Sequence, residues 1–226
     1  MKQKKNQNNI KKNLIKILNE IELLKTEKTK LPQIIAVTKN QTIEKIKKAI
    51  EAGIKIIAEN KIQEAEKKFK KTSIQVKKHF IGHLQTNKTK KAVKIFDVIQ
   101  TVDREKIIIK INEEAKKINK KQKIMLQINM SNDKNKYGYE KTEILTNCSK
   151  LKKYKNIEII GVMMMAPQNK TTKELQSIFK KTKKIQQEIQ KEIKKCKKIS
   201  MGMSGDYKEA VREGSTHLRI GTALFE

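Results

Sequence analysis

The arrangement of apolar segments constrains the fold of this chain more than any other feature. Short runs rich in Ile and Val alternate with longer, lysine-rich segments in which apolar residues recur at helical spacing. The short runs predict buried strands, and the longer segments predict amphipathic helices. We expect eight strands, at residues 33–39, 55–58, 76–81, 98–101, 124–130, 157–165, 199–203 and 216–221. We expect helices between them at residues 42–52, 61–71, 88–95, 104–119, 142–154, 171–195 and 207–213.

This alternation predicts an α/β protein with a parallel sheet. Eight strand–helix units favour a closed (β/α)8 TIM barrel, in which an extra N-terminal helix within residues 1–30 replaces the missing eighth helix. A doubly wound open sheet is the alternative, but no GxGxxG or GxxxxGK[ST] motif supports a nucleotide-binding version of it. Without a linker or a break in composition, we expect a single domain over residues 1–226, with the helix in 1–30 and the barrel in 31–226.

A formal net charge of +30 raises the question of nucleic-acid binding. Only three of the 54 basic residues are arginines, the residue that recognises bases and phosphates best, and the lysines are spread along the whole chain. We therefore expect no specific nucleic-acid partner. A non-specific polyanion binder remains an alternative, because dispersed positive charge attracts polyanions weakly.

The cysteines and the apolar runs bear on location. Cys148 and Cys196 lie far apart, without a CxxC motif, which favours a reducing, cytoplasmic environment. The N-terminal segment does not resemble a signal peptide, and the longest apolar run, Ile159–Ala166, is too short to span a bilayer. We therefore expect no membrane partner.

Lys39 is the strongest candidate functional residue, because it ends the first predicted strand. In a TIM barrel, functional groups gather at the C-terminal ends of the strands. A lysine at such a position is expected to point into a cleft, where loss of water lowers the pKa of its amine. An amine of this kind is a nucleophile suited to forming a Schiff base.

Three other strand ends carry further candidates. Asn60 follows the second strand and is suited to contacting a ring, or to capping the next helix. His83 follows the third strand and is expected to line the pocket, whereas His79 is expected to be structural. Because these histidines straddle a strand and a turn, we expect no metal site. Met163, in a methionine-rich sixth strand end, is suited to the core or to a ring contact.

The last two strand ends combine hydroxyl groups with small residues. Ser204 lies in the segment SMGMSGD, and Gly221 and Thr222 follow Arg219. Small residues let backbone N–H groups approach a phosphate, which TIM barrels often bind at these two loops. Either loop alone is compatible with an ordinary turn. Together with Lys39 they predict a site for a phosphate-bearing aldehyde.

Almost the whole chain resembles the YggS/PROSC family of pyridoxal phosphate (PLP) homeostasis proteins. The resemblance is carried by AVTKN (36–40), ENKIQEA (59–65), HFIGHLQTNK (79–88), GVMMMAP (161–167), SMGMSGDYKEAV (200–211) and GSTHLRIGTALF (214–225). The histidine segment and the SMGMS and RIGTA pair are the most specific. Ala58, where the family usually has glycine, and Lys78, where it usually has an aromatic residue, depart from the pattern.

The resemblance implies the barrel of the alanine racemase N-terminal domain. It also implies that PLP is covalently bound to Lys39 as a Schiff base. The other cofactor-binding residues that it implies are Ser204, Gly221 and Thr222 at the phosphate, Arg219 at the pyridine nitrogen, and Asn60, His83 and Met163 around the ring.

The same resemblance implies a role in intracellular PLP homeostasis, by buffering or delivering the cofactor, with PLP-dependent apo-enzymes as candidate partners. Arg219 has no hydrogen-bond acceptor, so the nitrogen beside it stays unprotonated and stabilises carbanions weakly. The alternative is a PLP-dependent amino-acid racemase. Alanine racemase takes a second base from an extra β-domain, and this chain ends where that domain would start. We therefore expect a non-catalytic PLP-binding protein, with a monomer as the working expectation.

Overall fold

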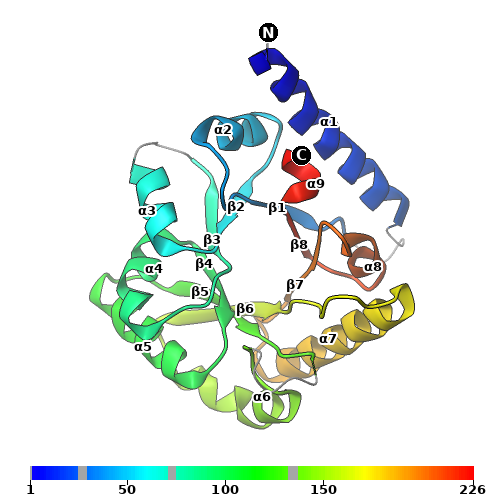
Figure 1. Ribbon diagram of the computed structural model, residues 1–226. Coiled ribbons are helices and arrows are strands. Elements are labelled where there is room, and N and C mark those ends of the chain that lie inside the picture. Colours follow the sequence, from blue (N-terminus) through cyan, green and yellow to red (C-terminus); the bar gives the residue numbers. More distant parts are fainter. Residues whose placement is uncertain (1, 25–29, 71–74, 132–136) are drawn as a thin grey trace.

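The computed structural model describes residues 2–24, 30–70, 75–131 and 137–226, and within them eight parallel strands form a closed barrel surrounded by helices (Figure 1). Neighbouring strands pair in chain order, and the last strand pairs with the first, so that Ile35 lies opposite Arg219. This closure confirms the predicted TIM barrel and excludes the open sheet. The strands are β1 (Gln33–Val37), β2 (Ile56–Glu59), β3 (Lys77–Phe80), β4 (Val98–Val102), β5 (Gln122–Gln127), β6 (Ile157–Met163), β7 (Lys198–Met203) and β8 (His217–Ile220).

The helices form the outer layer of the barrel. They are α1 (Lys2–Leu24), α2 (Ile43–Glu51), α3 (Ile62–Lys70), α4 (Thr89–Ile95), α5 (Glu105–Lys117), α6 (Lys141–Asn147), α7 (Thr172–Glu192), α8 (Tyr207–Arg212) and α9 (Thr222–Phe225), with short 3-10 helices η1 (Thr86–Lys88) and η2 (Cys148–Lys153). In the described ranges no helix is both long enough and apolar enough to cross a bilayer.

The predicted strands all occur, with ends within three residues of those observed. Two helix predictions need correction. The predicted helix 142–154 is divided into α6 and η2, and the last strand is followed by a helix, α9, where none was expected. Residues 25–29 of the predicted N-terminal helix segment and residue 71 of the predicted helix 61–71 lie outside the described residues.

Helix α1 fills the gap in the ring of helices, as predicted. It contacts α2, α8 and α9, and Figure 1 shows it lying beside α9. Ile10, Leu14 and Ile21 on its inner face are buried. The Tyr207 hydroxyl donates a hydrogen bond to Glu20, which ties α8 to α1. The two ends of the described chain are therefore packed together.

The interior of the barrel differs from the apolar layer between strands and helices. Two small apolar groups occupy it, one around Ile35 and Ile56 and one around Met125 and Met163. Polar side chains lie between them: Gln100 on β4 receives a hydrogen bond from Ser200 on β7. Because β4 and β7 are not neighbours in the sheet, this bond crosses the interior. The barrel axis is therefore partly polar.

Candidate functional site

Lys39 lies in a tight turn directly after β1. Thr38 is fully buried, and its carbonyl accepts a hydrogen bond from Gln41 N at 3.1 Å. Asn40 adopts a left-handed conformation with φ of 60°, which asparagine tolerates better than most residues. The predicted location at the end of the strand is correct. The predicted shielding from water is not, because the Lys39 side chain is exposed. Burial along this segment ends one residue earlier, at Thr38.

A buried ionic network fixes the turn that carries Lys39. The Thr38 hydroxyl donates to Glu59 Oε1 at 2.7 Å. Lys68 Nζ donates to the same oxygen and to the Thr38 carbonyl, both at 2.7 Å. Glu59 is fully buried, and a charge in that position is tolerated only when it is paired and hydrogen-bonded. No role was predicted for Glu59 or Lys68 from the sequence, in which the only indication is a carboxylate at the end of the second strand.

Asn60 presents a free acceptor next to this network. Its side-chain oxygen Oδ1 is buried and has no hydrogen-bond partner in the described part of the chain. This atom therefore does not cap α3, which was one of the two predicted roles. A Cβ atom built on Gly82 would lie 1.9 Å from the Asn60 carbonyl oxygen. The loops after β2 and β3 thus approach each other so closely that only glycine fits. A buried, unpaired acceptor is costly, and a ligand that donates a hydrogen bond would remove that cost.

His83 lies farther along the rim. Its Nδ1 is 3.3 Å from Asp103 Oδ2, and its ring stacks on Tyr137 with centroids 3.8 Å apart. The side chain is 29% exposed. The contacts of His83 are therefore with the loops after β4 and β5 rather than with the Lys39 turn. Over the described ranges, no group of three or more His, Cys, Asp or Glu residues is placed to hold a metal ion.

The loops after β7 and β8 form a cluster of one hydroxyl and two amides. Ser204 Oγ accepts hydrogen bonds from the backbone N–H groups of Gly221 and Ala223, at 3.3 and 3.2 Å. Gly221 is also close to β1, since a Cβ atom built on it would lie 3.5 Å from Val37 Cβ. The cluster is therefore next to β1, the strand that precedes the Lys39 turn. Thr222 is exposed at the start of α9. Backbone N–H groups were expected in this loop, but the helix that carries the Ala223 amide, α9, was not predicted.

Arg219 is 3% exposed and lies inside the barrel. Its Nη2 donates to the Met164 carbonyl at 2.7 Å, and its Nη1 donates to Ser200 Oγ at 2.8 Å. Burial lowers the pKa of the guanidinium to about 10, an effect that the negative charge of Asp206 partly offsets. Arg219 therefore remains a cation at neutral pH. Met163 is fully buried in the interior apolar group beside Met125.

A chain of hydrogen bonds continues from Arg219 across the barrel. Ser200 Oγ donates to Gln100 Oε1 at 2.7 Å, and Gln100 Nε2 lies 2.7 Å from His79 Nδ1. Because arginine can only donate, each following member of the chain also donates forward. His79 Nδ1 is therefore an acceptor, and its proton is on Nε2. His79 therefore lies inside the barrel, away from the C-terminal mouth, and its link to Arg219 was not expected.

Comparisons with known proteins first show the class of protein to which this barrel belongs. Residues 13–226 match the family described as "Alanine racemase, N-terminal domain". Solved structures with the same barrel include an alanine racemase from Clostridium difficile, with 17% identity and a TM-score of 0.72, which covers 96% of this chain and 56% of that one. At that identity the likeness shows the fold alone. The fold and the residues at its mouth thus define an alanine-racemase-type barrel.

Other relatives narrow this class to one family. A pyridoxal phosphate homeostasis protein from Synechocystis is 37% identical over 196 residues, covering 85% of this chain and 90% of the relative. One from Pasteurella multocida is 32% identical over 230 residues, covering 96% of each. The structure of PipY from Synechococcus elongatus with PLP bound has 30% identity and a TM-score of 0.87, covering 96% of this chain and all of that one. The chain belongs to the pyridoxal phosphate homeostasis protein family.

Proposed function

We propose that this protein binds PLP at the C-terminal mouth of its barrel, covalently through Lys39, and serves PLP homeostasis by buffering or delivering the cofactor. The observation that carries the proposal is the adjacency of two features. The turn bearing Lys39 follows β1, and the hydroxyl–amide cluster of Ser204 and Gly221 packs against the same strand. An amine and an anion-binding cluster side by side suit a phosphate-bearing aldehyde.

The residues at this mouth fit PLP. PLP supplies an aldehyde for an amine, a phosphate and a pyridine ring. Lys39 offers the amine, and its exposure leaves it accessible. Ser204, Gly221 and Thr222 are the phosphate ligands that we propose. The amides of Gly221 and Ala223 already point at Ser204 Oγ, so the donors of the two loops are gathered in one place before a phosphate binds. Bound PLP would also lie next to the Asn60 side-chain oxygen, which has no hydrogen-bond partner in the described part of the chain.

Arg219 supports a role without robust catalysis. We place its guanidinium at the pyridine nitrogen, with His83 and Met163 nearer the ring. The hydrogen bonds to Ser200 and to the Met164 carbonyl hold Arg219 in one orientation. Its pKa of about 10 keeps it protonated at neutral pH, so it cannot take a proton or accept a hydrogen bond from that nitrogen. An unprotonated nitrogen makes a weak electron sink, whereas strong carbanion-stabilising enzymes often place an aspartate there. Delivery to PLP-dependent apo-enzymes fits such a carrier.

The first test is spectroscopic and locates the covalent bond. The protein incubated with PLP should gain visible absorbance, and borohydride followed by peptide mass spectrometry should find the reduced cofactor on Lys39. Lys39→Ala should lose both signals. Lys47→Ala, which removes an exposed lysine from nearby α2, should keep them. Retention of the spectrum and of a single fixed lysine in Lys39→Ala would refute the assignment.

A second measurement tests the phosphate cluster. Replacement of both Ser204 and Thr222 by Ala should weaken PLP binding by about tenfold or more, because hydrogen bonds to a charged phosphate are lost. Binding of pyridoxal, which has no phosphate, should change little. Equal losses for the two ligands would reject the phosphate role. Racemisation of alanine by the PLP-loaded protein at an ordinary enzymatic rate would contradict the non-catalytic function.

A further inference from the structure

A second cavity lies at the opposite end of the barrel, and we call it the basal cavity. It has a volume of about 560 Å³ and lies at the N-terminal ends of the strands. Each of the eight strands contributes a residue to its lining. Ile56, Val98 and Ile160 give it apolar walls. The cavity is large enough for a drug-sized or nucleotide-sized molecule.

The charge around the basal cavity is strongly positive. Asp97 and Glu158, the two carboxylates in the lining, are already engaged. Asp97 Oδ2 accepts from Lys78 N at 2.7 Å, and Glu158 pairs with Lys195 at 3.1 Å. The lysines in the lining are Lys77, Lys123, Lys195, Lys197 and Lys198.

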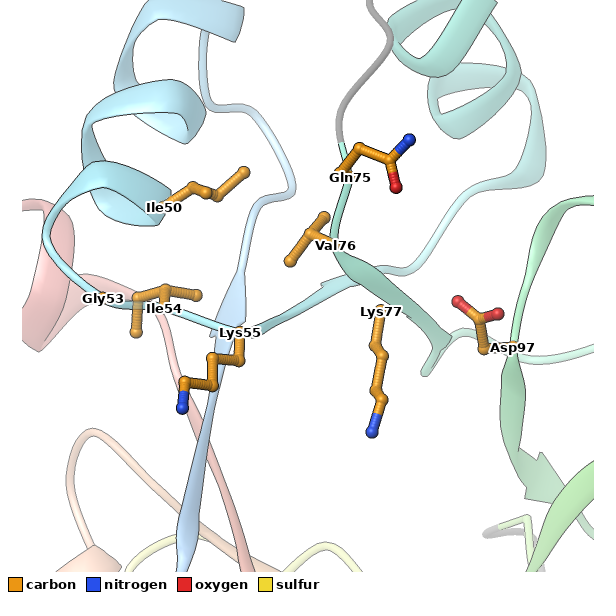
Figure 2. A pocket seen from close by; sticks show the side chains of 8 residues that line it. All are labelled: Ile50, Gly53, Ile54, Lys55, Gln75, Val76, Lys77 and Asp97. Atoms are coloured by element: carbon orange, nitrogen blue, oxygen red, sulfur yellow. The ribbon is translucent and has the colours of Figure 1, made fainter.

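Four of these five lysines are left without an anionic partner. Apart from Lys195, none makes an ion pair with any carboxylate in the described ranges. Lys77 also lines a neighbouring groove, where its ammonium group extends away from the Asp97 carboxylate (Figure 2). The positive charge of these four lysines is therefore available to bind an anion.

Two buried imidazoles form the inner wall of the cavity. His79 on β3 and His217 on β8 face each other across the barrel with centroids 6.3 Å apart and an angle of 28° between the rings. Each has its Nδ1 bound by the protein, to Gln100 and Thr216 respectively. Within the described ranges neither Nε2 has a hydrogen-bond partner.

These imidazoles are neutral at physiological pH. Burial, together with the closeness of His217 and of the Lys77 charge, lowers the pKa of His79 to about 3. Burial, together with the nearby lysines and Arg219, lowers the pKa of His217 to about 4. The direction of the hydrogen-bond chain from Arg219 puts the His79 proton on Nε2. An N–H donor without a partner in the described ranges therefore belongs to the lining of this lysine-rich cavity.

We propose that the basal cavity is a binding site for a small phosphate ester of the nucleoside diphosphate type, separate from the cofactor site. Lysine ammonium groups are good point-charge ligands for phosphate, and the His79 N–H adds a directional donor. The apolar walls suit a flat ring better than they suit bare inorganic phosphate. A long polyanion fits less well, because the described cavity is a pocket in the end of the barrel rather than a groove along its surface.

Calorimetric titration with ADP tests this site. ADP carries no aldehyde, so it cannot react with Lys39 as PLP would. At about 150 mM salt, where attraction between exposed charges is largely screened, ADP should bind saturably to the intact protein. Lys77→Gln combined with Lys198→Gln should weaken binding by at least about tenfold. The matched control is Lys180→Gln combined with Lys184→Gln, two exposed lysines on α7, which removes the same net charge and should change binding little.

Other ligands, an NMR measurement and a Lys39 variant test the proposal further. Inorganic pyrophosphate should bind more weakly than ADP, and adenosine should not bind measurably. In NMR spectra, ADP should shift the imidazole signal of His79 Nε2. Lys39→Ala should bind ADP like the natural sequence, which separates this site from the proposed function. The proposal would be overturned if both double variants weakened ADP binding equally. It would also be overturned if binding did not saturate below about 10 mM ADP, or if ADP left the His79 signal unmoved.

Discussion

His79 and His217 should make the free energy of unfolding depend on pH between 5 and 7. Both are buried at the same end of the barrel, and burial is the main reason that their pKa values fall to about 3 and about 4. His79 faces His217 and Lys77, and His217 faces Lys198, Lys77 and Arg219, so every charged neighbour further disfavours protonation. In the unfolded chain both histidines titrate near 6.5.

The size of the effect follows from proton linkage. Below pH 6.5 the unfolded state binds protons that the folded state does not, so stability is complete above 6.5 and is lost as the pH falls. At pH 5 the solution is about 1.5 pH units below the unperturbed value, and each unit corresponds to about 1.36 kcal/mol. Each histidine therefore costs about 2 kcal/mol, and the pair costs about 4 kcal/mol. Carboxyl groups contribute little in this window, because unperturbed Asp and Glu titrate near or below pH 4.3.

Urea unfolding of the cofactor-free protein at pH 7, 6 and 5 measures this loss. Replacing either His79 or His217 by Gln should remove about half of the pH dependence, and replacing both should remove most of it. His83→Gln is the matched control, because it removes the third histidine of the chain, which is partly exposed on the rim and lies outside the buried pair. A change below about 1 kcal/mol between pH 7 and 5, or an undiminished change in the double variant, would refute the reasoning.

Two substitutions test close contacts, one within the barrel and one between the loops after β2 and β3. Ser200→Ala leaves Arg219 Nη1 and the Gln100 amide oxygen without their partner, so we expect a loss of about 3 kcal/mol in urea unfolding; a loss below about 1 kcal/mol would contradict it. Gly82→Ala would place a Cβ atom 1.9 Å from the Asn60 backbone oxygen. We therefore expect a lower melting temperature and a loss of about 3 kcal/mol or more in the free energy of unfolding. Gly205→Ala, which meets open space, is its control, and equal effects would show that the contact is not decisive.

The alternation of strands and helices could be predicted because it depends on local periodicity. Thr38, Glu59 and Lys68 show where that reasoning stops. With lysines throughout the sequence, nothing local indicates that Lys68 on α3 is the partner of a buried carboxylate. The end of burial at Thr38, one residue before Lys39, is likewise set by tertiary contacts.

The contents of the barrel interior were harder to predict. Gln100 and Ser200 lie 100 residues apart on strands that do not pair, so their contact depends on how all eight strands are staggered. Single-strand patterns indicate that such residues alternate with apolar ones, but not what faces them across the barrel. The positions of Ser204, Gly221 and Thr222 directly after β7 and β8 were easier to predict, because they depend on where a strand ends and not on side-chain contacts; their role at a phosphate stays a prediction.

The pairing of β8 with β1 has a consequence for how the protein folds. The amide cluster at Gly221 is next to Val37 only after the first and last strands have paired. That pairing joins residues from opposite ends of the described chain, and contacts of such high sequence separation form slowly because they close a very long loop. The C-terminal mouth should therefore mature late, after the central strands have formed. During refolding, the protein should therefore begin to bind its ligand at this mouth only when folding is complete, later than its secondary structure appears.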